Sequence, residues 1–177
     1  MIDGDIKNAC ENSEMICIGL RNDPADDYLV GYVECCDEEG IIFCNVDYRG
    51  MKTGYIYMTN DKVTGVMYKP DYIQKLKILM SNKKQKYKKI FGSADIKETP
   101  VKEYFLRWIF TNKKMILVRD KDEEFKGILE SISEETVSIK VIDKITEKRN
   151  GYTSLSVICF QCPLSWWRPM AMTAWWT

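Results

Sequence analysis

An internal repeat is the feature of this sequence that most constrains its fold. When the chain is aligned with itself at an offset of 96 positions, residues 31–47 match residues 127–143 without a gap. Five of the 17 aligned pairs are identical, and six of the other 12 are apolar in both copies. The identical residues of the first copy are Gly31, Glu34, Glu38, Glu39 and Asp47. Self-similarity at a fixed offset predicts two tandem copies of one structural module.

Each copy has the pattern of short β-strands separated by turns. In the second copy, apolar Val137, Ile139 and Val141 alternate with their neighbours, which is the period of two that a strand produces. The repeated glycine, Gly31 or Gly127, falls inside a predicted strand. Glycine in a strand indicates a bend, a bulge or a close approach of two backbones. Such a kink would allow a short sheet to curl into a small barrel.

The alignment continues beyond its ungapped part. Upstream, residues 15–18 match residues 115–118 once a loop four residues longer is allowed in the first copy. Downstream, Gly54-Tyr55 matches Gly151-Tyr152 after one inserted residue. The first copy then continues through residues 57–68 with a turn and a closing strand, for which the second copy shows no similar sequence. We therefore expect the second barrel to be incomplete.

Two helices are predicted between the copies. Apolar residues in the range 72–80 recur at spacings of three and four, after Pro70 and with Asp71 as the expected N-cap. A second apolar stripe follows Thr99, the expected N-cap, and Pro100, which suits the first helical position. The predicted fold class is therefore mainly β with helices, consisting of two tandem small β-barrels that are each preceded or followed by a helix.

These patterns divide the chain into four parts. They are a first barrel with its flanking helix (1–80), a basic linker (81–98), a helix with the second barrel (99–158), and a tryptophan-rich tail (159–177). The tail holds four of the five tryptophans and a single charged residue, Arg168. It is interpreted either as a replaced segment, for example from a shifted reading frame, or as the strand that closes the second barrel.

The order of motifs in the first copy resembles the Sm-like fold, a small and strongly bent five-stranded barrel. The motifs are Val-Gly-Tyr-Val-Glu at 30–34, Asp-Glu-Glu at 37–39, Ile-Ile-Phe-Cys-Asn-Val-Asp at 41–47 and Asp-Lys-Val-Thr-Gly-Val-Met-Tyr at 61–68. The doubled arrangement resembles uncharacterised bacterial proteins with tandem modules of this kind, over residues 15–68 and 115–158. SH3-like and PRC-type barrels produce similar spacing.

The resemblance implies RNA binding, but the residues depart from the family at the base-binding loop. The Sm pattern there is Asp, two spacers, an apolar residue and Asn. Asp37 matches the first position, whereas Gly40 and Ile41 occupy the last two, and the second copy begins with Ser133. The basic-plus-glycine signature of the second Sm motif remains only as residues 62–65. A likeness of fold does not by itself carry the function over.

Composition excludes several classes of protein. The chain has 26 basic and 26 acidic residues and a formal charge of zero, so attraction to nucleic acid or an anionic surface requires a local patch. It has no histidine, which excludes Ser-His-Asp and Cys-His catalysis and zinc sites built on histidine. P-loop, Rossmann and nucleophile-elbow motifs are absent from the sequence. We predict a protein that is not an enzyme and that holds no cofactor or metal.

Cysteine use and hydropathy predict a cytoplasmic location without a membrane span. The seven cysteines lack the even pattern of a secreted disulfide framework, and no apolar run approaches 18 residues. The acidic, polar start is unlike a signal peptide. We expect the cysteines to be small buried apolar residues. Cys159 and Cys162 have C-x-x-C spacing, but one such pair supplies only two of the four ligands of structural zinc.

Two groups of basic residues are candidate contact sites. The first is a run around one aromatic residue, consisting of Lys83, Lys84, Lys86, Tyr87, Lys88 and Lys89. Such a run can bind phosphates and stack a base, or it can be a solvated helix end and linker. The second group precedes the repeated Gly-Tyr and consists of Arg49, Lys52, Lys148 and Arg149. These residues would contact an anion or a peptide, or would lie in solvated hairpins.

The function predicted from these features is non-catalytic binding or scaffolding. Exposed edges of small sheets invite strand addition or ring assembly, which favours a protein partner or self-association. The alternative is binding of single-stranded RNA or DNA through the basic run and the basic hairpins.

Overall fold

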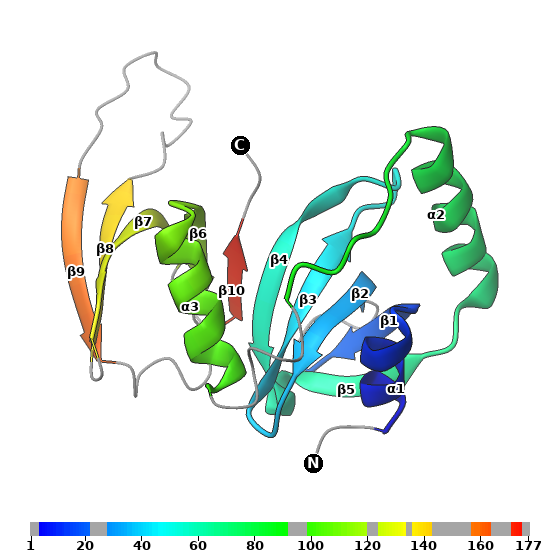
Figure 1. The fold of residues 1–177 in the computed structure, drawn as a ribbon, viewed down its shortest axis with the longest axis horizontal. Coiled ribbons are helices and arrows are strands. Elements are labelled where there is room, and N and C mark those ends of the chain that lie inside the picture. The colour runs from blue at the N-terminus through cyan, green and yellow to red at the C-terminus, as the bar shows by residue number, and fades with distance from the viewer. Residues whose placement is uncertain are drawn as a thin grey trace. The chain divides into compact units, whose positions relative to one another are not determined.

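The chain folds into two compact units, Met1–Phe105 (unit 1) and Leu106–Thr177 (unit 2) (Figure 1). The computed structural model describes residues 4–21, 28–91, 99–119, 124–133, 136–142, 157–163 and 171–174. Antiparallel strands and three α-helices make up the regular structure of this described part. The predicted mixture of strands and helices is therefore confirmed.

Unit 1 is built around five antiparallel strands in the order β5-β1-β2-β3-β4. Its elements are α1 (Gly4–Asn12), β1 (Met15–Leu20), β2 (Tyr28–Cys36), β3 (Gly40–Val46), β4 (Lys52–Thr59), the 3₁₀ turn η1 (Asn60–Lys62), β5 (Val63–Met67), α2 (Pro70–Asn82) and the start of α3 (Val101–Thr111). Among the described residues no ladder joins β4 to β5, so the sheet is not shown as a closed barrel.

Unit 2 repeats the same strand order. Its strands are β6 (Met115–Arg119), β7 (Glu124–Ile132), β8 (Thr136–Ile142), β9 (Val157–Pro163) and β10 (Ala171–Ala174). β10 pairs with β6, which pairs with β7, and β8 lies between β7 and β9. β10 therefore takes the place beside β6 that β5 takes beside β1, and the tail supplies that strand. The alternative of a replaced segment stays a hypothesis.

The strand pairings confirm the repeat at the predicted offset. β2 and β7 start and end 96 residues apart, as do β3 and β8. Gly31 pairs with Asn45, and Gly127 pairs with Val141. Both ladders also shift register at the same place, between Val33 and Cys35 in the first copy and between Leu129 and Ser131 in the second. The two copies therefore share one bulged hairpin.

The repeated glycines are required by a close approach of backbones. A Cβ atom at Gly31 would collide with the carbonyl oxygen of Cys44. A Cβ atom at Gly127 would collide in the same way with the carbonyl oxygen of Lys140, which is 96 residues beyond Cys44. Only glycine leaves room for these carbonyls, so the prediction of a close backbone approach is confirmed in both copies.

The downstream part of the alignment is corrected by the ladders. Gly54 pairs with Asn45 on β3. The residue equivalent to Asn45 in the second copy is Val141 on β8, and Val141 pairs with Ile158. By strand register Gly54 therefore corresponds to Ile158 and not to Gly151, which lies outside the described residues. Cys159 and Cys162 lie within β9.

The predicted helices exist, but their caps differ from those expected. The residue preceding α2 is Lys69, Pro70 occupies the first turn, and Asp71 lies inside the helix rather than at its N-cap. At the start of α3 the backbone N–H of Val101 donates to Oδ2 of Asp37 at 2.7 Å. An acceptor from a distant turn therefore caps this helix, where the sequence suggested Thr99. The short helix α1 was not predicted.

The two faces of the unit 1 sheet are covered by different elements. One apolar cluster joins α1 to the sheet and consists of Ile6, Ala9, Cys10, Ile16, Ile18, Val33, Ile41, Phe43 and Met58. Along β4, Tyr55 and Tyr57 alternate with Ile56 and Met58, which belong to or pack against that cluster, and both tyrosines are buried. Their rings lie 5.3 Å from that of Phe91 and 6.5 Å from that of Phe105, respectively. Residues after α2 thus complete the second core.

Candidate functional site

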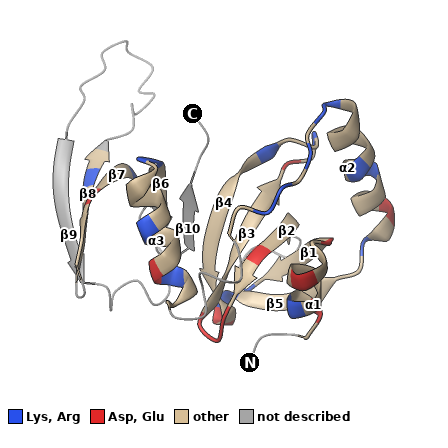
Figure 2. Ribbon diagram, in the orientation of Figure 1, with Lys and Arg blue, Asp and Glu red and all other residues tan. Residues whose placement is uncertain are grey.

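The basic run after α2 is an extended segment with two different sides. Gln85, Tyr87, Lys89 and Phe91 are partly or fully buried, and each follows an exposed residue. The exposed residues are Lys84, Lys86, Lys88 and Ile90. Figure 2 shows this mostly basic segment crossing unit 1 from the end of α2. An alternation with period two is that of an extended chain lying on a surface. The segment predicted as a linker therefore lies against unit 1 as far as Phe91.

A left-handed residue turns the chain out of α2 and into this segment. Lys84 has a φ of 55°, and the N–H of Gln85 donates to the carbonyl of Met80 at 2.8 Å. Bonds of this kind satisfy the free carbonyls at a helix end. After the turn, Lys84 and Lys86 line the same pocket as Lys77 of α2.

One face of the aromatic ring in the run is already stacked on a residue of the sheet, and the residue is partly buried. The ring of Tyr87 lies 3.8 Å from that of Tyr32 on β2, with an angle of 6° between their planes. Burial, followed by the charge of Glu34, raises the pKa of Tyr87 well above its usual value. Tyr87 thus anchors the segment to the sheet.

Lys89 also points inward. Its ammonium nitrogen Nζ donates to the carbonyl oxygen of Cys10 at 2.7 Å and lies 3.4 Å from the sulfur of the same residue. A lysine of the predicted contact run therefore ties the segment to the C-terminal end of α1. Its ammonium group therefore binds a carbonyl oxygen of unit 1 and does not point toward an external anion.

Glu34 fixes the end of the segment from inside the sheet. Its side chain is fully buried, and Oε2 accepts hydrogen bonds from the backbone N–H groups of Ile90 at 2.8 Å and Phe91 at 3.2 Å. Burial raises the pKa of this carboxyl, against the effect of these hydrogen bonds. The other oxygen, Oε1, and the hydroxyl of Tyr87 are both buried without a hydrogen-bond partner.

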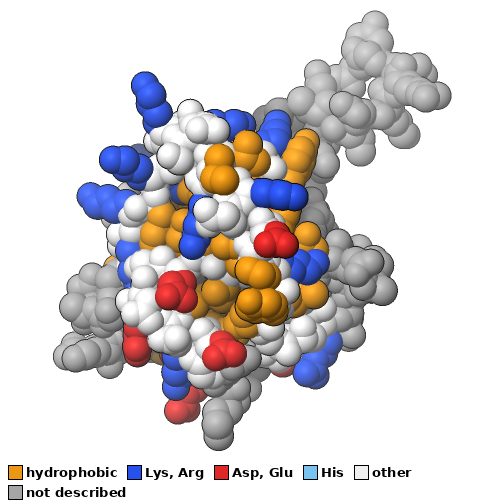
Figure 3. Space-filling model, turned by 90° about the vertical axis from the view of Figure 1, so that its right-hand side faces the viewer, with side chains coloured by type: hydrophobic (Ala, Val, Ile, Leu, Met, Phe, Trp, Pro, Cys, Tyr) orange, Lys and Arg blue, Asp and Glu red, His pale blue; other side chains and the backbone are white. Residues whose placement is uncertain are grey.

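A half-open pocket lies between the end of α2 and the basic segment. Its volume is about 310 Å³, and it is lined by Tyr32, Lys77, Met80, Ser81, Lys84, Gln85 and Lys86. Three lysines thus surround a space whose inner wall includes an aromatic ring and a methionine. Figure 3 views the molecule from the side on which α2 lies in Figure 1, and hydrophobic side chains lie there among lysine and arginine side chains.

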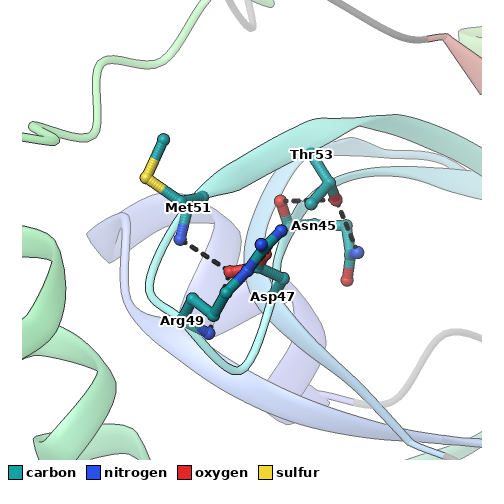
Figure 4. Close-up of polar contacts among 5 residues, drawn as sticks. All are labelled: Asn45, Asp47, Arg49, Met51 and Thr53. Carbon is teal, nitrogen blue, oxygen red and sulfur yellow. Dashed lines mark hydrogen bonds and ion pairs between the residues drawn. The ribbon is translucent and has the colours of Figure 1, made fainter.

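Lys52 and Arg49, the candidates from the first hairpin, are placed differently. Lys52 donates from Nζ to the carbonyl oxygen of Lys86 at 3.2 Å, so the hairpin and the basic run meet. Arg49 instead forms an ion pair with Asp47, at 2.9 Å between Nη2 and Oδ2 (Figure 4). The guanidinium also donates from Nε to the same oxygen at 2.9 Å. The charge of Arg49 is therefore compensated within its own turn.

Asp47 organises this turn. Its Oδ1 accepts from the backbone N–H groups of Arg49 and Met51, each at 2.9 Å (Figure 4). Burial by itself would raise the pKa of Asp47, but these N–H groups and the Arg49 side chain outweigh it, and the pKa lies below its usual value. Beside the turn, Asn45 donates from Nδ2 to Oγ1 of Thr53 at 2.8 Å. Asp47 thus holds the turn of the first basic hairpin in place and compensates the charge of Arg49.

The structure brings together only part of the predicted site. Lys84 and Lys86 line the pocket, Lys52 joins them, and Lys83 and Lys88 are exposed nearby along the segment. Lys148 and Arg149 lie outside the described residues. Lys77, Tyr32 and Glu34 were missed by sequence reasoning. Glu34 could have been found from the sequence, because the repeat places an identical glutamate at position 130. Lys77 could not, because in sequence it resembles any other exposed lysine of a helix.

Comparisons with known proteins identify no relative of this chain, so its function is inferred from the geometry of the site. No family model matches this chain, and neither curated proteins nor solved structures yield a match. Within the described ranges, no helix is long and apolar enough to cross a bilayer. The same ranges contain no cluster of three or more Cys, Asp or Glu side chains that could hold a metal ion.

Proposed function

We propose that this chain is a non-catalytic binding protein whose lysine-lined pocket in unit 1 takes an acidic segment of a protein partner. The observation that carries the proposal is the convergence of Lys77, Lys84 and Lys86 on one half-open pocket. Among the described residues that line the pocket, none is acidic. A partner carboxylate entering it would meet three positive charges in a partly desolvated space, where attraction exceeds that in bulk water.

Apolar groups beside the lysines favour a partner that is both acidic and hydrophobic. Met80 and Tyr32 form part of the pocket wall. On the same helix, Ile78 and Leu79 keep 51% and 37% of their surface exposed. Burying such side chains yields about 25 cal/mol per Å² of apolar area. An acidic segment with leucine-like side chains would satisfy both features of this surface.

The position of Tyr87 favours a protein partner over nucleic acid. Sequence-independent binding of single strands relies on exposed aromatic rings on which bases stack. Within the basic run that ring is stacked on Tyr32 inside unit 1. One observation supports the alternative, since Lys84, Lys86 and Lys88 are exposed at alternate positions along one extended segment. Single-stranded RNA or DNA is therefore the second candidate ligand.

The proposed modules are two Sm-like or SH3-like small barrels in a bacterial, cytoplasmic protein. The strand order supports this part of the proposal, because a sheet whose fifth strand pairs with its first is beginning to roll up. The glycine bend in each copy supports it as well. For the binding role without catalysis, support comes from the lack of histidine and from the use of buried Glu34 as a structural anchor.

Fluorescence anisotropy with labelled probes tests the proposed function. The probes are a short peptide that alternates Glu and Leu, its counterpart with Gln in place of Glu, and a mixed-sequence single-stranded DNA. We expect the Glu-Leu peptide to bind most tightly. The variants Lys77→Gln and Lys86→Gln should each weaken that binding about tenfold, which corresponds to about 1.4 kcal/mol.

A lysine on the same helix provides the matched control. Lys75 is exposed on α2 but does not line the pocket, so Lys75→Gln should leave the affinity unchanged within about twofold. Equal effects of Lys75→Gln and Lys77→Gln would contradict a pocket-specific site. Tighter binding of DNA, with a steep loss of affinity as salt is raised, would replace this proposal with the nucleic-acid alternative. No binding of any probe at low salt would remove both.

A further inference from the structure

We infer that Glu34 is a positioning residue for the lysine-lined pocket, because its buried carboxyl holds the basic segment (residues 83–91) that forms one wall of the pocket. The inference rests on the proposed function and adds to it a residue that sets the affinity of the pocket without touching the ligand. Within the described part of the chain, the lining of the pocket does not include Glu34.

The wall in question has no regular structure of its own. Lys84, Gln85 and Lys86 line the pocket from the basic segment, together with Lys77 of α2. Residues 85–90 belong to no helix or strand, so neither helical nor ladder hydrogen bonds fix their position. The placement of these lysines therefore depends on contacts between the segment and the rest of unit 1.

Two positions of β2 supply such contacts. The ring of Tyr32 is stacked on that of Tyr87, with 3.8 Å between the ring centres. Two residues further along β2, Oε2 of Glu34 accepts from the backbone N–H groups of Ile90 at 2.8 Å and Phe91 at 3.2 Å. Tyr32 is itself part of the pocket lining. One strand thus contributes to the pocket and also anchors the segment that forms its wall.

The burial of Glu34 lowers stability and is not dictated by the repeat. Its side chain is 0% exposed, and Oε1 has no hydrogen-bond partner. A buried polar atom without a partner is destabilising. In the second copy the identical Glu130 is exposed, so the shared strand pattern does not require a buried glutamate. Departures of this kind from the usual rules of folding concentrate at functional sites.

A wall that is held before the ligand arrives favours binding. Ordering a free segment on binding costs conformational entropy, which lowers affinity. The two hydrogen bonds to Glu34 order the end of the segment during folding instead. Lys86 depends on them most, because the N–H of Lys84 is already bonded to the carbonyl of Ser81 in α2, at 2.9 Å. The bond from Lys52 to the carbonyl of Lys86 is exposed, so water competes for it.

Hydrogen exchange of the unmodified, full-length protein tests whether the wall is formed in advance. We expect the amide protons of Ile90 and Phe91 to be protected without any peptide. Saturation with the Glu-Leu peptide should change their exchange rates by less than about twofold, because their acceptor is present in the free protein. Protection that arises only with the peptide would overturn the inference, since the ligand would then order the segment.

Variants of Glu34 test the effect on affinity. Glu34→Ala should weaken binding of the Glu-Leu peptide about tenfold, because the segment loses both hydrogen bonds. Glu34→Gln keeps an acceptor oxygen and should bind within about threefold of the unmodified protein.

A core residue on the other face of the sheet provides the matched control. Ile18 is buried in the apolar cluster that joins α1 to the sheet and does not line the pocket. Ile18→Ala should destabilise unit 1 yet leave the peptide affinity unchanged within about twofold. Urea denaturation of each variant separates a loss of affinity from a loss of folding.

The outcomes distinguish this inference from the proposed function. If the unmodified protein does not bind the peptide, the proposed function fails and the inference fails with it. If the unmodified protein and Glu34→Ala bind equally tightly, only the inference fails. Equal losses of affinity in Glu34→Ala and Ile18→Ala, or no recovery in Glu34→Gln, would assign the effect to stability and would also overturn the positioning role.

Discussion

Asp37, in the turn between β2 and β3, accepts a hydrogen bond from the backbone N–H of Val101 at 2.7 Å and so caps α3 across 64 residues of sequence. Its other carboxylate oxygen accepts from the N–H groups of Glu39 and Gly40, each at 2.9 Å. One side chain therefore closes a turn and starts a helix. In the second copy Ser133 keeps the turn, since its hydroxyl accepts from the N–H of Thr136 at 3.0 Å.

The first prediction follows from this double role of Asp37. Asp37→Ala should lower the free energy of unfolding by about 2–3 kcal/mol, because a helix cap and two turn hydrogen bonds are lost together. Ser133→Ala removes only the turn contact and should cost about 1 kcal/mol. Urea denaturation followed by circular dichroism measures both variants. Equal losses would show that the contact with Val101 contributes nothing.

The second prediction concerns the two repeated glycines. Gly31→Ala should destabilise unit 1 by about 2–3 kcal/mol, because the added methyl group meets a backbone carbonyl that has no room to move. Gly127→Ala should destabilise unit 2 in the same way. The control is Gly4→Ala, since a Cβ atom at Gly4 meets nothing within 4 Å. Thermal unfolding of the three variants checks the expectation, which would be wrong if Gly31→Ala behaved like Gly4→Ala.

The third prediction concerns the pH dependence caused by Glu34. Its pKa is raised from 4.5 in the folded state by burial, so the folded protein holds this proton more tightly than the unfolded chain. The corresponding stability is fully present below about pH 4.5 and is lost as the pH rises through the folded pKa. Glu34→Gln should remove this slope from urea midpoints measured across mildly acidic to neutral pH.

A second substitution at the same position separates charge from hydrogen bonding. Glu34→Ala leaves the N–H groups of Ile90 and Phe91 without their acceptor and should cost about 2–3 kcal/mol at every pH. Glutamine keeps an acceptor for these groups, and its amide can donate to the Tyr87 hydroxyl. A midpoint of Glu34→Gln that still falls with pH like that of the unmodified protein would assign the slope to another group.

The fourth prediction concerns Asp47, whose pKa is shifted in the opposite direction. Its folded pKa lies below the usual 3.8, because hydrogen bonds outweigh the effect of burial. The stability it contributes is therefore present above about pH 3.8 and is lost as the pH falls through the lower, folded value. Asp47→Asn should flatten this acid limb in urea titrations. Arg49→Gln, which changes an exposed partner, should have a much smaller effect, and a reversed ranking of the two variants would contradict this assignment.

Local signals in the sequence predicted the repeat, the two longer helices and most of the strands. They aligned the counterpart of β4 at Gly151-Tyr152 rather than at β9, and they offered β10 only as one of two readings of the tail. Apolar periodicity and the two glycines depend on contacts within one hairpin, so an alignment of the chain with itself can detect them. The cap of α3 could not be found in this way, because its acceptor, Asp37, is distant in sequence. The short α1 has only Ile6, Ala9 and Cys10 on its buried face, too few for a clear pattern.

The candidate site was predicted only in part for a physical reason. A run of lysines has the same appearance in sequence whether its charges face water or protein. In the structure Lys86 lines the pocket, whereas Lys89 donates to the carbonyl oxygen of Cys10 inside unit 1. The two lysines differ because alternate side chains of an extended segment point to opposite sides. The sequence around Glu34 likewise does not show that this carboxyl is buried. Its hydrogen-bond donors are the backbone N–H groups of residues 90 and 91, which are distant in sequence.

The contact at the two repeated glycines has a consequence for how the copies diverge. The group that fills the space is a main-chain oxygen, which every residue carries, and it belongs to a cysteine at position 44 and to a lysine at position 140. Selection on this contact therefore acts on one partner alone. This contact places no constraint on the side chain of the facing residue, and no pairwise covariation would record the contact. Two copies could lose nearly all identity and still bend at the same point, provided that each kept its glycine.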